Sequence, residues 1–241
     1  MSEGIHEGNG KIDVLDHGYV RLVKPWGTDL DIVNAARVSY AKETTEMRPQ
    51  DIRLLQFLAR EGHTSPFRHA FVSFEVYCPL LVARQWWKYV VGSDHVMDAW
   101  NESSRRYITE EPTFYIPKPQ EWRSAPKNSK QGSGPVMDVD AIGAPTTEAL
   151  LHYVDEGLKL YEQALESGIA PEQARLFLPA YGMYMRFRWS TSLQAVAHFL
   201  NQRMEHDAQW EIKQFALAVY DLVKPLFEHS IKVLVDGQTE E

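Results

Sequence analysis

Cysteine is almost absent from this chain of 241 residues, which contains only Cys78. A single cysteine excludes an internal disulfide and a thiolate metal cage within one chain, and it suits a reducing cytoplasm. No cationic residue adjoins Cys78 in the sequence, so no charge is at hand to lower the pKa of its thiol. We therefore interpret Cys78 as a small buried side chain and not as a nucleophile.

Long apolar runs are also missing. No run approaches the roughly 20 residues that a helix needs to cross a bilayer. The first residues, MSEGIHEGNGK, are polar and lack the apolar segment of a signal peptide. We expect a cytoplasmic protein with no membrane partner.

Several nucleotide and hydrolase motifs are absent as well. The chain has no G-x-S-x-G elbow, no G-x-x-x-x-G-K-[ST] loop and no glycine-rich dinucleotide motif. The dyad His206-Asp207 resembles the metal-binding dyad of some phosphohydrolases, which leaves a metal phosphohydrolase as an alternative. No two histidines have the i, i+4 spacing of a helical metal clip, so we expect no metal site.

Positive charge is scarce, because 25 Lys and Arg face 33 Asp and Glu, a formal net charge of -8. A cationic block nevertheless spans LLVARQWWKYVVG and WNESSRRY, with aromatic, amide and hydroxyl side chains between the charges. Arginine forks match phosphate or carboxylate oxygens, and aromatic faces receive a ring. Since a nucleic-acid site usually makes a whole face basic, the block favours a small anionic, planar ligand. Its cations are Arg84, Lys88, Arg105 and Arg106.

Helical and alternating patterns are mixed along the chain, and no repeat or clear linker divides it. This predicts one α+β domain over residues 1–241, with a long loop at 117–145 that is rich in Pro, Gly, Ser and Lys. The predicted elements are a hairpin over Lys11–Lys24, a helix from Thr28 or Asp29 through Val38, a helix from Pro49 to Gly62, a strand over His69–Cys78, a helix from Pro79 to Val91, a strand over Thr113–Ile116, a helix over Thr146–Ser167, a short helix between Pro171 and Pro179, a long helix over Leu193–Val223 and a last helix over Leu226–Val235.

Two of the predicted helices have faces that bear on function. In the helix over Thr146–Ser167 we expect a buried stripe of Leu150, Leu151, Val154, Leu158, Tyr161 and Leu165. The helix from Leu193 has an amide-rich side, which is typical of a buried polar site or a subunit interface, although a plain exposed polar face is equally compatible. That side carries Gln194, His198, Asn201, Gln202 and Glu205, with Arg203 among them.

Ordered motifs then connect these segments to a known family. The chain contains R-Q-W-W, N-E-x-S-x-R-Y, A-R-x-x-L-P, F-L-N-x-R and A-Q-W-E-I in this order, preceded by A-A-R-V-S and G-H-T-S-P-F. With these motifs the chain resembles the flavin-dependent thymidylate synthases, in register from about Ile12 to Leu222 except for the long loop. The motifs lie at Arg84–Trp87, Asn101–Tyr107, Ala174–Pro179, Phe199–Arg203, Ala208–Ile212, Ala35–Ser39 and Gly62–Phe67.

The resemblance implies a homotetramer with a central, mostly antiparallel sheet and flanking helices. It implies the methylation of dUMP to dTMP, with methylenetetrahydrofolate as carbon donor and FAD reduced by NADPH as hydride donor. No enzyme nucleophile is needed in that reaction, in agreement with the interpretation of Cys78. No nucleic-acid partner is expected.

The resemblance also assigns residues by position. Arg203 and Arg106 are the expected catalytic residues, which hydrogen-bond the pyrimidine oxygens and stabilise the negative charge that builds in the ring. The expected dUMP site comprises Gln85, Lys88, Glu102, Ser104, Arg105, Arg106, Arg175 and Arg203. The expected FAD site comprises Ser39, His63, Ser65, Lys88, His95, Asn101, Glu102, Gln194, His198 and Gln202, with His198 and Gln202 acting on a neighbouring subunit.

The chain departs from the family on the flavin side. Lys88-Tyr89-Val90 stands in place of the R-H-R signature, and extra residues lie between this triplet and Ser104. Ser192, Gln194 and Asp207 stand where the family usually has Asn, Arg and His. One interpretation is a subgroup that holds flavin in another way, with His95 as a substitute imidazole. The alternatives are a related pyrimidine-nucleotide enzyme with a different one-carbon product and a nucleotide-binding protein that has lost flavin chemistry.

Overall fold

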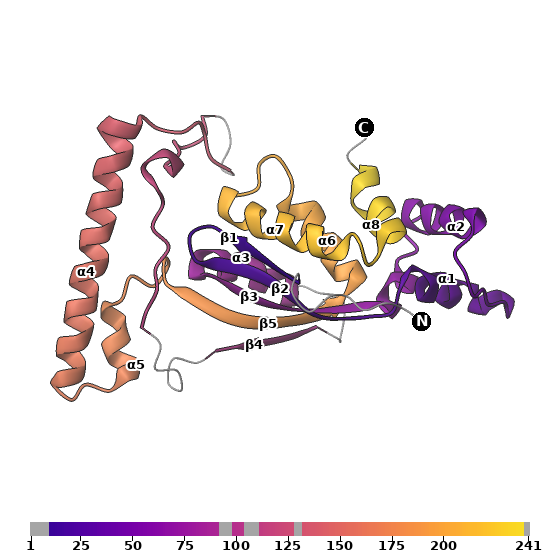
Figure 1. Cartoon of the computed structure of the whole chain (residues 1–241), viewed down its shortest axis with the longest axis horizontal. Helices are drawn as coiled ribbons and strands as arrows, with labels where there is room; N and C mark the ends of the chain where they lie inside the picture. Colours follow the sequence, from indigo (N-terminus) through magenta and orange to yellow (C-terminus); the bar gives the residue numbers. More distant parts are fainter. Residues whose placement is uncertain (1–9, 92–97, 104–110, 128–131, 239–241) are drawn as a thin grey trace.

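A five-stranded antiparallel sheet with helices packed on one face forms the body of the molecule (Figure 1). The computed structural model describes residues 10–91, 98–103, 111–127 and 132–238. The strand order is β1-β2-β3-β5-β4, and every neighbouring pair is antiparallel. The predicted α+β class with a mostly antiparallel sheet is confirmed. The strands are β1 (Lys11–Val14), β2 (Gly18–Trp26), β3 (Phe71–Pro79), β4 (Ala99–Glu102) and β5 (Tyr184–Ser192).

Strand β3 shows why this sheet has two different faces. Val72, Phe74 and Val76 alternate along the strand and are fully buried, as the sequence pattern predicts. Glu75 and Tyr77 lie on the opposite, half-exposed face. Side chains on this second face form a polar network instead of a core.

Three helices cover the apolar face of the sheet: α3 (Leu80–Val91), α6 (Leu193–Arg203) and α7 (Trp210–Val223). Trp86 of α3 is fully buried and stacks on Phe199 of α6, with 4.5 Å between ring centroids. Trp87, the next residue, is exposed and contacts Trp100 of β4. Consecutive helical residues point about 100° apart, so only one of the two tryptophans can enter the core.

A second group of helices lies at one end of the sheet (Figure 1). It comprises α1 (Asp29–Arg37), α2 (Pro49–Arg60) and α8 (Glu228–Leu234). Thr28 caps α1 in a capping box with Asp31, as expected for a helix that starts after Thr28. Short 3₁₀ turns at Val38–Tyr40 and Ser65–His69 follow α1 and α2.

An arm projects from the opposite end of the body and carries α4 (Ala144–Glu166) and α5 (Pro171–Ala174) (Figure 1). The stripe predicted for this helix is only half-buried: the buried residues of α4 are Gly157 and Ala164, and Leu151 is 50% exposed. The half-buried members of the stripe are Leu150, Val154, Leu158, Tyr161 and Leu165. Few other parts of the chain pack against the arm, so most side chains of α4 stay at least partly exposed. At Gly157 a Cβ atom would lie 2.8 Å from the carbonyl oxygen of Phe177, so a side chain there would push the arm apart.

Three other predictions about the elements need correction. β5 was not predicted, although it lies between β3 and β4 in the sheet. The predicted strand at Thr113–Ile116 is only an isolated bridge between Phe114 and Met183. The predicted long helix over Leu193–Val223 is broken into α6 and α7 by a turn between Arg203 and Trp210. No helix in the described part of the chain is long and apolar enough to cross a membrane.

Candidate active site

A cavity of about 440 Å³ lies where α3, the end of α6 and the turn before α7 meet. Four residues predicted from the sequence line it together: Gln85, Lys88, Gln202 and Arg203. They come from positions more than 100 residues apart, and the break between α6 and α7 turns the end of α6 toward α3. The remaining lining residues are Gly132, Glu205, Asp207, Ala208 and Gln209.

Gln85 is held in place before any ligand binds. Its Nε2 atom donates to the side-chain oxygen of Gln209 at 2.5 Å and to the backbone oxygen of Leu81 at 3.2 Å. With both donors used, the Gln85 carbonyl oxygen is fixed in direction and remains to accept a hydrogen bond. Gln209 belongs to the A-Q-W-E-I motif, and this contact gives the motif a structural role.

Arg203 supplies a cation to the same cavity. Its guanidinium lies over the ring of Tyr89, 5.1 Å from the ring centroid. Its Nε atom is buried, and no hydrogen-bond partner for it exists in the described part of the chain. A buried N–H without a partner is costly unless a ligand satisfies it, so this atom indicates a binding site.

A polar stripe leads along α6 to the cavity. Gln194, His198 and Gln202 are spaced four residues apart and therefore lie on one face of the helix, over about 12 Å. His198 and Gln202 are exposed. The Oε1 atom of Gln194 is buried and, among the described residues, has no hydrogen-bond partner. Ser192, where the family usually has Asn, caps α6 by accepting a hydrogen bond from the backbone N–H of Ala195 at 3.3 Å.

Asn101 and Glu102 of β4 lie in a second, smaller cavity of about 290 Å³. They alternate across the strand, as neighbouring strand residues do. Asn101 is opposite Arg188 of β5, and Glu102 accepts a hydrogen bond from Trp100 Nε1 at 2.8 Å. Within one chain, these two predicted residues do not join the residues of the first cavity.

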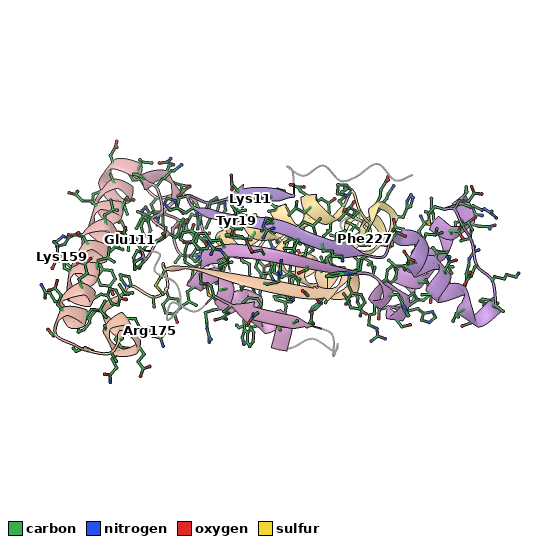
Figure 2. All side chains as sticks on the ribbon, turned by 60° about the horizontal axis from the view of Figure 1, so that its bottom comes forward. Lys11, Tyr19, Glu111, Lys159, Arg175 and Phe227 are labelled. Atoms are coloured by element: carbon green, nitrogen blue, oxygen red, sulfur yellow. The ribbon has the colours of Figure 1, made fainter. Side chains whose placement is uncertain are left out.

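Other predicted residues lie at the two ends of the molecule. Ser39, His63 and Ser65 are exposed near α1 and α2, and the His63 ring meets the Phe57 ring edge-on with 5.9 Å between centroids. Arg175 is exposed on the arm, where Figure 2 shows it far from the helical end of the body. One chain therefore does not bring these residues to the cavity. Ser104, Arg105, Arg106 and His95 lie outside the described residues.

Cys78 is fully buried in the core, and burial raises the pKa of its thiol well above the ordinary value. A neutral, enclosed thiol is a poor nucleophile. Across residues 10–91, 98–103, 111–127 and 132–238, no group of three or more His, Cys, Asp or Glu could hold a metal ion. His206 is 92% exposed, so the His206-Asp207 dyad has no support from a surrounding ligand set.

The sequence did not predict the parts that Tyr89 and the long loop play beside the cavity. Tyr89, noted only as a departure from the signature, contacts Arg203 directly. Gly132 of the long loop lies against the backbone of Asp207, where a Cβ atom would be 3.0 Å from the carbonyl oxygen. Arg123 of the same loop pairs with Glu211 and lies 4.7 Å from the ring of Trp210. The loop is thus fastened to the start of α7, beside the cavity.

Comparison with known proteins identifies the group to which this site belongs. The sequence model of the family described as "Thymidylate synthase complementing protein" matches residues 21–228. The chain belongs to this family. Flavin-dependent thymidylate synthase from Thermus thermophilus is 41% identical over 220 residues, which cover 90% of this chain and 76% of that protein. The synthase from Thermotoga neapolitana is 38% identical over 209 residues, 87% of each chain.

A solved structure shares the fold of this family member. The UMP/dUMP methylase PolB from Streptomyces cacaoi, bound with 5-Br dUMP, superposes with a TM-score of 0.78 at 26% sequence identity. The match covers 92% of this chain and 96% of that chain. The recognition of the family from ordered motifs is confirmed.

Proposed function

We propose that this chain is a flavin-dependent thymidylate synthase that methylates dUMP to dTMP, with methylenetetrahydrofolate as carbon donor and NADPH as reductant. The observation that carries the proposal is the cavity that gathers Gln85, Lys88, Gln202 and Arg203 in a member of this family. Its chemistry suits a nucleotide, because it combines two cations with amides that can read a planar ring.

The residues of the cavity have different roles in binding and activating the pyrimidine. Arg203 donates N–H groups to the pyrimidine oxygens and stabilises negative charge on the ring as C5 becomes nucleophilic. The fixed carbonyl oxygen of Gln85 accepts a hydrogen bond from a ring N–H. We also assign Glu102, Ser104, Arg105, Arg106 and Arg175 to the nucleotide and its phosphate, and Arg106 to catalysis.

The side chains along α6 fit a flavin ring, which presents both carbonyl and N–H groups. The unpartnered, buried Oε1 of Gln194 is an acceptor for such an N–H, and Gln202 at the other end of the stripe supplies further amide groups. When bound, FAD supplies the hydride that completes the methyl group. We propose that Lys88, His95, Gln194, His198 and Gln202 hold it, together with Ser39, His63, Ser65, Asn101 and Glu102.

The substrate ring acts as the nucleophile in this scheme, and the protein supplies none. The enclosed thiol of Cys78 supports this part of the proposal.

We propose a homotetramer in which several copies complete each site. Ser39, His63 and Ser65 lie at one end of the molecule and Arg175 at the other, so a single chain cannot present them to one ligand. The arm also exposes large apolar side chains of the kind that a second copy covers: Leu176 is 82% exposed, and Leu151, Tyr153, Leu160, Phe177 and Tyr181 are exposed as well. We place the enzyme in the cytoplasm.

Flavin absorbance of the purified protein, with and without dUMP, tests the proposal. We expect a yellow protein whose flavin spectrum shifts when dUMP binds. A colourless protein that takes up no added FAD would contradict it. UMP should be titrated in parallel, since PolB is a methylase of both UMP and dUMP. A product with another one-carbon group at C5 would favour the alternative of a related pyrimidine-nucleotide enzyme.

A further inference from the structure

Tyr89 occupies the position where the family signature R-H-R has its histidine. It lies on α3, four residues after Gln85, and therefore on the same face of the helix as that cavity residue. Its side chain is half-buried, whereas neighbouring Lys88 is exposed. The substitution thus places an aromatic ring against the wall of the proposed nucleotide site.

The ring of Tyr89 is fixed by the packing between α3 and α6. It meets Phe199 edge-on with 5.2 Å between centroids, and it lies 5.6 Å from the ring of His198. Phe199 is fully buried against Trp86. Tyr89 is therefore backed by the core, and its orientation is set before any ligand arrives.

One face of this fixed ring receives the Arg203 guanidinium, 5.1 Å from the centroid. Burial raises the pKa of Tyr89, and the positive charge of Arg203 and a side-chain hydrogen bond from its guanidinium to the phenolic oxygen oppose that rise, as expected for a cation held close to the phenol. Among the described residues, no carboxylate forms an ion pair with Arg203, although Glu205 and Asp207 line the same cavity. The aromatic ring is thus the observed support of this cation.

Support by a ring has a chemical advantage over support by a carboxylate. A carboxylate would occupy the N–H groups of the guanidinium and neutralise much of its charge. An aromatic ring attracts the face of the guanidinium and leaves its N–H edge free. That free edge is the part that a pyrimidine carbonyl needs.

We propose that Tyr89 is a positioning residue, which holds the Arg203 guanidinium through its ring so that the N–H groups are presented to the pyrimidine of the substrate. This inference rests on the proposed function. Tyr89 acts through Arg203, and its ring, which lies under the guanidinium, is the main support, with the phenolic oxygen as a secondary contact. The role belongs to this chain's Lys-Tyr-Val triplet and would be absent where the signature has histidine.

The test measures dUMP affinity of the FAD-loaded, full-length protein by calorimetry, and KM and kcat for dUMP in parallel. Tyr89→Phe keeps the ring and loses only the hydroxyl, so it should weaken dUMP binding less than Tyr89→Leu does. Tyr89→Leu should weaken dUMP binding by about threefold to tenfold, the range expected when one cation–π contact is lost. In the Arg203→Ala background, Tyr89→Leu should weaken dUMP binding no further.

A second series keeps the shape of the side chain. Phenylalanine with stepwise fluorination of its ring, placed at position 89, weakens the attraction for a cation with little change in size. The dissociation constant for dUMP should rise with each added fluorine, while the melting temperature stays the same. This series tests the proposal even if the Tyr89→Leu variant fails to fold.

Tyr220→Leu is the matched control, because Lys224 lies 4.8 Å from the Tyr220 ring in a similar pair outside the cavity. It should leave dUMP affinity unchanged. The proposal is overturned if fluorination leaves the affinity flat, or if Tyr89→Leu weakens binding equally with and without Arg203. A parent protein that binds no dUMP contradicts the proposed function instead, and this outcome is visible before any variant is made.

Discussion

Arg37 of α1 and Asp51 of α2 form an ion pair in which the Asp51 side chain is fully buried. The same carboxylate accepts a hydrogen bond from the backbone N–H of Arg48 at 2.9 Å. Arg37 belongs to the A-A-R-V-S motif and is followed directly by the 3₁₀ turn that carries Ser39. This pair therefore fixes the turn at Ser39 relative to α2.

Removing one partner of a buried pair leaves the other charge uncompensated. We expect Asp51→Ala to lower the free energy of unfolding by about 3–5 kcal/mol, measured by urea denaturation. The control is Asp13→Ala, because Asp13 pairs with Lys11 but is 80% exposed, and we expect a change of less than about 1 kcal/mol. Equal losses in the two variants would show that burial of the Arg37–Asp51 pair is unimportant.

Arg203→Ala should lower kcat/KM for dUMP by about 30-fold to 5,000-fold, which corresponds to roughly 2–5 kcal/mol for a buried charged hydrogen bond. The flavin spectrum should remain normal, because Arg203 is assigned to the substrate. Arg60→Ala is the control, since Arg60 is 70% exposed on α2. If Arg203→Ala were as active as the parent, the assignment of Arg203 to catalysis would be wrong.

Cys78→Ala should form dTMP at a rate within about twofold of the parent, since the thiol is enclosed and its pKa is raised. A drop in melting temperature of a few degrees is expected, because a small void forms in the core. Product formation is measured with the parent as reference. Complete loss of turnover in a folded variant would indicate a cysteine nucleophile and contradict the scheme.

We predict that the folding stability of the protein depends on pH through Glu75, which lies on the half-exposed face of the sheet. Burial tends to raise its pKa, but hydrogen bonds from Arg21 and Tyr19 dominate and hold the pKa below its ordinary value of 4.5. The stabilisation is therefore present above pH 4.5 and is lost as the pH falls through the lowered, folded-state pKa. Glu75→Gln should be less stable than the parent at about pH 6, and the difference should shrink below about pH 4.5.

The Tyr19→Phe variant checks the cause of this effect. It removes one hydrogen-bond donor to Glu75 and keeps the ring. The stability difference between parent and Tyr19→Phe should therefore change with pH in the same direction as for Glu75→Gln, but by a smaller amount. If Glu75→Gln and Tyr19→Phe each differ from the parent in stability by an amount that does not change with pH, Glu75 and Tyr19 contribute through packing only.

Much of the fold followed from periodicity. The alternation in β3 and the cap at Thr28 are local signals, and both were predicted. β5 was missed although Arg186 and Arg188 alternate with the buried Phe187 and Trp189, a period of two that predicts a half-buried strand. Arg186 is accommodated by tertiary partners, the ring of Tyr77 and the hydroxyl of Tyr19, which a single-sequence pattern does not reveal.

The break between α6 and α7 was missed because neither proline nor glycine marks it. Glu205–Gln209 is polar and could continue a helix, and the turn is instead stabilised by contacts from elsewhere, such as Gln85 to Gln209. For the site, family motifs located Gln85, Lys88, Gln202 and Arg203, which share one cavity. The role of Tyr89 depends on how α3 packs on α6, so it required the structure.

The most direct measurement of the central claim is product analysis of an omission series. The protein, stripped of its bound flavin, is incubated with dUMP, methylenetetrahydrofolate, NADPH and FAD, and each component is left out in turn. We predict that mass spectrometry finds dTMP only in the complete mixture, with NADPH consumed in step with product. Formation of dTMP without flavin, or no C5-modified nucleotide in the complete mixture, would contradict the account.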